Sequence, residues 1–247
     1  MPLLEDEAIV LRHYPLSDSD RIIVLLTREN GKVRAVAKDA KRPQSRIAAC
    51  LEPLTHLRLE FYSREGRDLC QVRRTELIHA YLGRTQSLKH IYAYIYFAEI
   101  CNEIAQDNQA NQPLFRLILA TLSAGEKLGI HPPLLRYFEI WCLKLSGFLP
   151  NYAYCSNCGK CVKDDEFFAW FDAGQARCNA CSQGRGFKVG AAASAALVMM
   201  AKCSPEQFLA QQFEEHALRE IERLAQKLLD LHLEKKLKSY RILKEAL

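Results

Sequence analysis

The sequence lacks an apolar run long enough to cross a membrane. Its longest apolar stretch without a charged residue, 189–201, is shorter than the ~20 residues that span a bilayer, and Lys188 and Lys202 flank it. The first seven residues include three acidic side chains, whereas a signal peptide begins with basic residues followed by an apolar core. We therefore expect a reduced, soluble, cytoplasmic protein.

Sequence motifs of common enzyme classes are also absent. There is no phosphate-binding G-x-x-x-x-G-K-[ST] and no G-x-S-x-G, and Gly184, Gly186 and Gly190 lack the spacing of a dinucleotide-binding loop. A zinc deaminase requires His-x-Glu before its cysteine pair, but His232-Leu-Glu234 follows the paired cysteines. We expect no catalytic residues and no enzyme.

Composition and charge are ordinary for a globular protein. The chain has 247 residues, of which 49% are hydrophobic and 26% charged, and this length suits one large domain or two to three small ones. The net charge of +5 is a mild bias toward anionic partners, and the distribution of the charges matters more than their sum.

Cysteine is abundant, with ten residues in the chain. Half of them are scattered among apolar neighbours, where buried thiols are common: Cys50, Cys70, Cys101, Cys142 and Cys203. The others are grouped, and they include two C-x2-C pairs, Cys155-Ser-Asn-Cys158 and Cys178-Asn-Ala-Cys181. Two such pairs about 19 residues apart are typical of a tetrahedral four-cysteine zinc site.

Residues 166–174 between the pairs alternate bulky side chains and end in a turn signal, which predicts a β-hairpin and hence a small zinc ribbon. We expect one structural Zn2+ on Cys155, Cys158, Cys178 and Cys181, because Gly159 then follows the first pair as a turn. Cys161 is an alternative ligand, since Cys158-Gly-Lys-Cys161 has the same spacing. Two matched pairs favour a metal over redox use, and four cysteine ligands leave no position for water.

Residues 1–80 have the pattern of an all-β domain. Five β-rich runs are predicted, at 7–12, 21–27, 32–37, 54–62 and 68–73. Asn30-Gly31 is a strong hairpin signal, and residues 63–66 form a second turn. Closure removes exposed strand edges, so five short strands favour a small closed barrel of the OB type.

Basic residues are concentrated within this region: Arg28, Lys32, Arg34, Lys38, Lys41, Arg42 and Arg46. Lys32 and Arg34 lie two apart and so share one face of their strand. A basic strand and loop on a small barrel is suited to binding a phosphate backbone. The alternative is a solvated, charged barrel face, and the residues alone leave both open.

From residue 82 the apolar period becomes helical. Helices are expected at 88–98, 114–122, 132–145, 191–201, from Ser204, at 214–233 and in the basic tail. The prediction is an α+β fold with an N-terminal OB-fold β-barrel followed by an all-α helical domain with an inserted four-cysteine zinc ribbon. The predicted domains are 1–80, 81–150 with 188–247, and the insertion 151–187.

This order of parts resembles the bacterial recombination-repair protein RecO family. The matching segments are Glu7-Ala-Ile-Val-Leu11, Asp18-x-Asp20, Thr27 through Gly31, the basic segment 38–45, Phe138-Glu139, Gly147-Phe-x-Pro150, both cysteine pairs and Leu237-Lys-Ser239. The family often has glycine where Asp39 stands, which implies a less open basic loop in this chain.

The resemblance implies an OB-fold domain that binds single- and double-stranded DNA and anneals complementary strands without a nucleotide. It also implies partnership with RecR and with the C-terminal tail of single-stranded-DNA-binding protein, so that RecA loads on coated strands in gap and double-strand-break repair at the nucleoid. Two other classes stay open: a zinc-ribbon adaptor that binds protein, and a ribosome- or transcription-associated factor that binds RNA.

Overall fold

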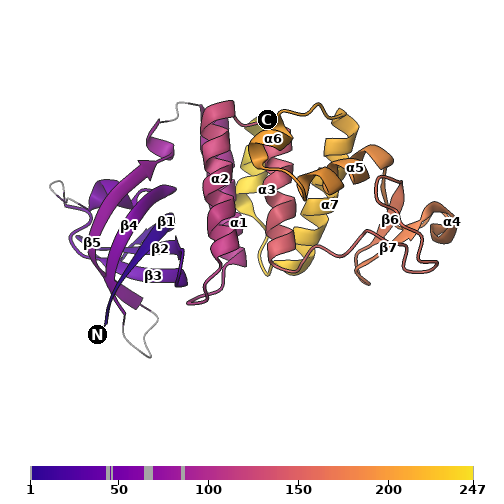
Figure 1. Ribbon diagram of the computed structural model, residues 1–247. Coiled ribbons are helices and arrows are strands. Elements are labelled where there is room, and N and C mark those ends of the chain that lie inside the picture. The colour runs from indigo at the N-terminus through magenta and orange to yellow at the C-terminus, as the bar shows by residue number, and fades with distance from the viewer. Residues whose placement is uncertain (1, 43–44, 46, 64–68, 85–86, 247) are drawn as a thin grey trace. The chain divides into compact units, whose positions relative to one another are not determined.

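Five strands at the N-terminal end close into a barrel in the order β1-β2-β3-β5-β4 (Figure 1). They are β1 (Leu3–Pro15), β2 (Arg21–Thr27), β3 (Gly31–Ala37), β4 (Thr55–Tyr62) and β5 (Leu69–Ala80). The structure is a computed structural model that describes residues 2–42, 45, 47–63, 69–84 and 87–246. The predicted five-stranded barrel is confirmed, and its assignment to the OB type stays a prediction.

Strand β1 closes the barrel because it pairs with two neighbours. Its first half, from Leu3 to Ile9, pairs with β4, and its second half, from Ala8 to Pro15, pairs with β2. A bulge between Val10 and Arg12 interrupts the β1–β2 ladder, with Ala8 to Val10 before it and Arg12 to Pro15 after it. Such a bulge bends the strand and turns the residues after it to the opposite face.

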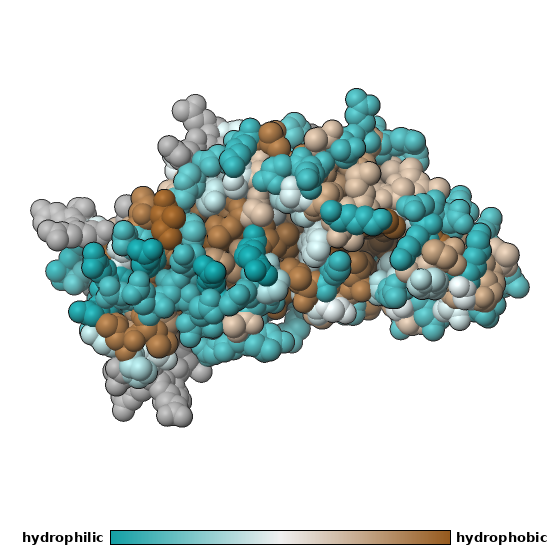
Figure 2. All heavy atoms as spheres, in the orientation of Figure 1, coloured by the Kyte–Doolittle hydropathy of each residue, from teal (hydrophilic) through white to brown (hydrophobic). Residues whose placement is uncertain are grey.

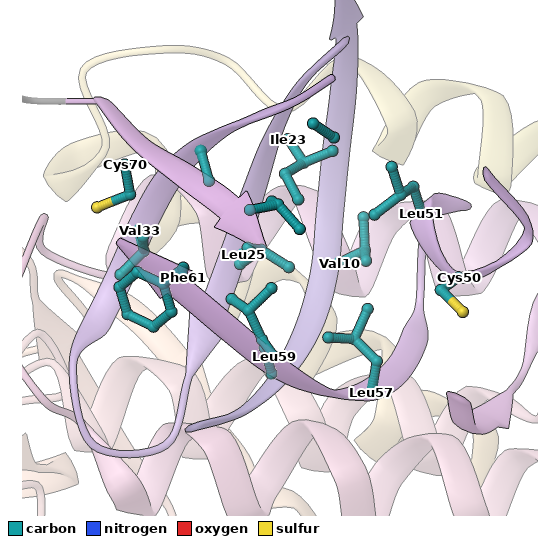
Figure 3. Packing of buried hydrophobic residues seen from close by; sticks show 14 of the residues in the cluster. Val10, Ile23, Leu25, Val33, Cys50, Leu51, Leu57, Leu59, Phe61 and Cys70 are labelled. Carbon is teal, nitrogen blue, oxygen red and sulfur yellow. The ribbon is translucent and has the colours of Figure 1, made fainter. Parts of the chain in front are cut away.

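The barrel interior is filled by alternate side chains of the strands. Figure 3 shows Ile23, Leu25 and Val33 pointing inward together with Leu57 and Leu59. In β3 the inward residues alternate with Lys32 and Arg34, so the prediction that these two cations share one face is confirmed, and that face is the outer one.

The predicted hairpin at Asn30-Gly31 joins β2 to β3, where Thr27 pairs with Gly31. Gly31 has φ +70°, and a Cβ there would lie 2.1 Å from the carbonyl oxygen of Gln109, so no larger residue fits. Of the second predicted turn only Ser63 is described, and the remainder lies outside the described residues.

Three helices belong to the same compact unit as the barrel, which comprises residues 1–126 and 237–247. They are α1 (Leu88–Ile104), α2 (Gln112–Leu128) and α8 (Lys238–Ala246). Helix α1 packs against β1, β2 and α8. The Glu99 carboxylate on α1 accepts hydrogen bonds from the backbone N–H groups of Lys238 and Ser239, which satisfies the first donors of α8.

The second compact unit, residues 127–236, contains the cysteine pairs. Its helices are α3 (Pro132–Leu145), α4 (Asn179–Ser182), α5 (Ala191–Met200), α6 (Pro205–Leu209) and α7 (Glu215–His232). Its strands β6 (Phe167–Trp170), β7 (Gln175–Cys178) and β8 (Phe187–Val189) form a sheet in the order β7-β6-β8, which confirms the predicted hairpin. The division into two units is coarser than the three predicted domains, whose boundaries stay a prediction.

The helices before and after the cysteine segment pack together, because α3 contacts both α6 and α7. A buried ion pair lies at this junction: the Arg136 guanidinium donates to one carboxylate oxygen of Glu139 at 2.8 Å, its Nε lies 2.8 Å from the other oxygen, and it pairs with Glu222 at 2.9 Å. Glu139 is fully buried, so loss of Arg136 would leave an uncompensated charge. Within the described residues no helix is long and apolar enough to span a membrane.

A candidate metal centre and a candidate nucleic-acid interface

Four cysteine side chains meet at one end of the β6–β7 hairpin. The sulfurs of Cys155, Cys158, Cys178 and Cys181 all lie within 4.8 Å of one another. The Sγ atoms of Cys158 and Cys178 are 3.7 Å apart. Sulfurs held about 2.3 Å from a common centre at tetrahedral angles lie about 3.8 Å apart, so the four thiols have the geometry of ligands to one ion.

Each cysteine pair lies on a tight backbone turn. The N–H of Gly159 donates to the carbonyl oxygen of Cys155 at 2.9 Å, and Gly159 adopts φ +72°, which favours glycine. The second pair is held by β7 and α4, since Cys178 ends the strand and precedes the helix. The C-x2-C spacing therefore brings the two sulfurs of each pair close together, because both backbone turns are short.

The electrostatics of the four thiols fit a cation. Burial raises the pKa of the Cys155 thiol, but the backbone N–H groups of Cys178, Cys158 and Asn157 outweigh it and lower this pKa to about 6. The backbone N–H of Lys160 lowers the pKa of Cys158, while the three neighbouring thiols raise it, to about 11 in total. These pKa values favour a thiolate at Cys155 and a thiol at Cys158, and a cation bound between the sulfurs would favour the thiolate form of both.

Cys161 lies outside the four-sulfur group that the described residues form. It is exposed and pairs through its backbone with Tyr154 in a β-bridge. The geometry brings together the four cysteines that the sequence favoured. Tetrahedral sets of four thiolates hold zinc or iron–sulfur centres.

On β3, the predicted interface residues Lys32 and Arg34 differ in their surroundings. The Lys32 side chain is only 12% exposed; its ammonium donates to the carbonyl oxygen of Asn102 at 2.9 Å and pairs with Asp107 at 3.4 Å. Arg34 also reaches Asp107, at 3.5 Å, but half of its side chain stays exposed. Lys32 thus ties β3 to the end of α1, and its role as a DNA contact stays a prediction.

The loop after β3 presents three further predicted residues, Lys38, Lys41 and Arg42, all exposed. The Arg42 guanidinium pairs with the Asp39 carboxylate at 2.9 Å. The Lys41 ammonium donates to the carbonyl oxygen of Ser17. These cations form one surface, and Asp39 offsets part of its charge.

The loop is anchored to the segment that joins β1 and β2. The N–H of Lys41 donates to the carbonyl of Ser19, and the N–H of Asp39 donates to the Asp20 carboxylate, both at 2.9 Å. The hydrogen bond from Asp39 is the main reason that the pKa of Asp20 is lowered, with the Ser19 hydroxyl adding to the effect. These two hydrogen bonds connect the backbone of the basic loop to the β1–β2 segment.

Two further residues that were predicted to bind DNA, Arg28 and Arg46, are not part of β3 or of the described loop after it. Arg28 lies in the β2–β3 turn, where it pairs with Glu7 at 3.7 Å and Glu29 at 3.4 Å. Arg46 lies outside the described residues, and its assignment stays a prediction. On the face of Figure 2, hydrophilic side chains dominate the barrel, with small hydrophobic areas between them.

The sequence patterns did not single out Arg12 and Tyr14, which belong to this same outer surface of the barrel. Both side chains are exposed, and the Arg12 guanidinium lies 4.9 Å from the centroid of the Tyr14 ring. Simple alternation from Val10 would have directed them inward, and only the bulge before Arg12 places them outside.

Comparisons with known proteins cover both units. The family model described as recombination protein O N terminal matches residues 1–81, and the model described as recombination protein O C terminal matches residues 85–241. The DNA repair protein RecO of Koribacter versatilis is 35% identical over 166 residues, which cover 67% of this chain and 68% of that protein. The DNA repair protein RecO of Anaeromyxobacter dehalogenans (strain 2CP-C) is 34% identical over 178 residues, or 71% and 69% of the two chains.

Proposed function

Because the chain belongs to the recombination protein O (RecO) family of non-enzymatic DNA repair proteins, we propose that it is a DNA-binding recombination mediator. It binds single- and double-stranded DNA, anneals complementary single strands, and helps RecA load on DNA coated by single-stranded-DNA-binding protein. These steps serve gap and double-strand-break repair. The observation that carries the proposal is the group of exposed cations on β3 and the loop after it.

The mechanism is electrostatic. Arg34, Lys38, Lys41 and Arg42 carry positive charge on one side of the barrel, and Arg28, Lys32 and Arg46 complete the proposed set. Two DNA strands repel each other through their phosphates, and cations between them lower that repulsion while releasing condensed counterions. Complementary bases then meet without any nucleotide being consumed, which agrees with the missing phosphate-binding loop.

The barrel is proposed to be an OB fold. Its five strands follow the order β1-β2-β3-β5-β4, and β1 closes the barrel by pairing with both β2 and β4. OB folds bind nucleic acid on strands 2 and 3 and on the adjoining loops. The cations of β3 and of the loop after it lie on that part of the barrel, which supports both the fold assignment and the DNA-binding role.

The four-cysteine site is proposed to hold one structural Zn2+. When bound, the ion would supply the positive charge that allows Cys155, Cys158, Cys178 and Cys181 to ionise together. The surrounding contacts fit a structural role, because the site is linked to the helices of its own unit. Ser194 on α5 donates to the carbonyl of Val162 at 3.2 Å. The Glu220 carboxylate on α7 accepts from Gly190 at 2.7 Å.

Partners follow from the same proposal. RecR and single-stranded-DNA-binding protein would contact the chain directly and RecA indirectly, in the cytoplasm at the nucleoid. A cavity of about 410 Å3 in the second unit offers a place for the acidic tail of the single-stranded-DNA-binding protein. Trp141, Phe167 and Met200 contribute apolar walls, and Lys144 and Lys202 add positive charge that complements such a tail.

A strand-annealing assay tests the function. Complementary oligonucleotides precoated with single-stranded-DNA-binding protein should anneal faster with the chain than without it. The matched control is the variant with Lys38, Lys41 and Arg42 changed to Ala, which should lose most of the acceleration. No acceleration on naked or coated strands contradicts the proposal, and a strong preference for RNA of equal length would point to the RNA-binding class.

A further inference from the structure

We propose that Tyr14 stacks on an unpaired base of bound DNA, on an outward face of β1, β2 and β3 flanked by Arg12 and Arg34. This inference rests on the proposed function and extends it from the phosphates to the bases. The occupant is single-stranded DNA, because an apolar row on this face lies beside two guanidinium groups, as the bases of a single strand lie beside its phosphates.

An apolar row crosses the three strands. Tyr14 pairs with Ile22, and Ile22 pairs with Val36. Residues directly opposite in antiparallel strands share a face, so the three side chains form one row. Ile23 and Ala35, their neighbours in β2 and β3, are fully buried in the barrel core, which places this row on the outside. Tyr14 is 39% exposed, and Ile22 and Val36 are partly exposed.

A second row beside it carries the charge. Arg12 pairs with Val24, which pairs with Arg34. Both arginine side chains are exposed at the ends of this row. The face therefore offers an aromatic and aliphatic strip with guanidinium groups along one side. A single strand laid on it places bases against Tyr14 and phosphates against the arginines.

The Tyr14 ring is held in place by its neighbours. The Arg12 guanidinium, 4.9 Å from the ring centroid, makes a cation–π contact that restricts the ring. The segment that follows is fixed as well, since the N–H of Leu16 donates to the carbonyl of Asp20 at 3.0 Å. Asp20 in turn holds the basic loop through Asp39. Hydrogen bonds of the segment after Tyr14 thus connect the end of β1 to the basic loop.

The physical consequence is a preference for single strands. Bases in a duplex are stacked and paired, so only their phosphates reach a flat protein surface. An unpaired base exposes its π-face and can stack on tyrosine, with an expected gain in affinity of about tenfold for one base. Tyr14 then adds to single-strand binding alone, whereas the cations add to both forms of DNA.

The test compares the full-length chain with Tyr14→Ala and Tyr14→Phe on a single-stranded oligonucleotide and on a duplex of the same length. Tyr14→Ala should bind the single strand about tenfold more weakly, with unchanged duplex affinity and an unchanged salt slope. Tyr14→Phe should retain the affinity. Tyr154→Ala is the matched control, because Tyr154 is 53% exposed and has Lys163 5.7 Å from its ring centroid.

Equal losses for single strand and duplex, or no loss at all, would overturn the inference while the proposed function stands. Absence of DNA binding by the unmodified chain would overturn the proposed function itself. Photo-crosslinking to a 5-iodouracil-substituted single strand needs no variant: the crosslinked peptide should contain Tyr14. Crosslinks confined to other peptides count against the inference even if Tyr14→Ala fails to fold.

Discussion

Asp39 combines an unusual backbone conformation with an opposing charge. Its φ of 55° lies in the left-handed region, which glycine adopts without strain and aspartate tolerates. Its carboxylate pairs with Arg42 at 2.9 Å and so neutralises one of the cations of the basic loop. The conformation explains why glycine suits this position, and the ion pair explains how aspartate reduces the attraction for phosphate.

Asp39→Gly should therefore strengthen DNA binding without loss of stability. Release of Arg42 adds about one phosphate contact, so the slope of log K against log salt for single strands should steepen by about 0.7. The exposed ion pair contributes at most about 1 kcal/mol, which relief of backbone strain offsets. Salt titrations and thermal melting measure both effects.

Asp39→Asn is the matched control, because it removes the charge and keeps a side chain that tolerates the left-handed region. Both variants should raise affinity. If neither does, Asp39 does not limit phosphate binding; if only the glycine variant does, backbone freedom and not charge is the cause.

Cys158 and Cys161 differ in their positions relative to the candidate metal site, although both fit a C-x2-C pattern. The sulfur of Cys158 belongs to the four-sulfur group, whereas Cys161 is exposed and lies outside it. Cys158→Ser should lose bound zinc, while Cys161→Ser should retain one ion per chain in metal analysis. Zinc retention in Cys158→Ser with loss in Cys161→Ser would reverse the ligand assignment.

At the scale of elements, β3 and the loop after it act as one basic surface. The loop is fixed to the β1–β2 connection by backbone hydrogen bonds from Lys41 and Asp39. Cations on a fixed loop lose less conformational entropy on binding than cations on a flexible tail. More of their electrostatic attraction to phosphate therefore contributes to the affinity for DNA.

The Lys38, Lys41 and Arg42 triple change to Ala should flatten the salt dependence. With about five phosphate contacts, the single-strand slope is near −3.5, and three lost contacts bring it to about −1.4. Affinity should fall irrespective of base sequence. The measurement is binding of a labelled single strand over a range of salt concentrations.

A matched triple, Arg58, Arg73 and Arg74 changed to Ala, removes the same charge from β4 and β5, where each arginine pairs with a glutamate. Its slope should stay near that of the unmodified chain. Equal flattening by both triples would show a general charge effect and not a site.

At the scale of the whole molecule, the metal centre and the basic surface belong to different compact units. Structural zinc contributes on the order of 10 kcal/mol to the folding of small domains, enough to decide whether the ribbon folds. The cations of the barrel do not depend on those cysteines for any contact described above. Removal of the metal should therefore lower the stability of the second unit without weakening DNA binding by the barrel.

Chelation of zinc should lower the melting temperature of the second unit while DNA affinity at low temperature stays within about twofold, since no predicted DNA contact is lost. Calorimetry with and without chelator measures the first effect, and binding titrations measure the second. Normal melting of a zinc-free chain contradicts a structural role, and parallel loss of DNA binding contradicts the separation.

Local patterns in the sequence were sufficient for the five barrel strands, the β6–β7 hairpin, most helices and the four-cysteine group, whereas β8 was not predicted. Alternation predicted that Lys32 and Arg34 lie on one face of their strand, and the spacing of two short turns predicted that four sulfurs meet. Both depend on residues near each other in the chain, where backbone geometry alone sets the distance. The family resemblance rests on the same local segments.

Tertiary structure decided the rest. The bulge between Val10 and Arg12 turns Arg12 and Tyr14 outward, against the alternation that Val10 begins. Lys32 is bound by Asn102 and Asp107, partners about 70 residues away that no local pattern connects to β3. Barrel closure and the docking of α1 create these contacts, so which cations stay available for DNA depended on the folded chain.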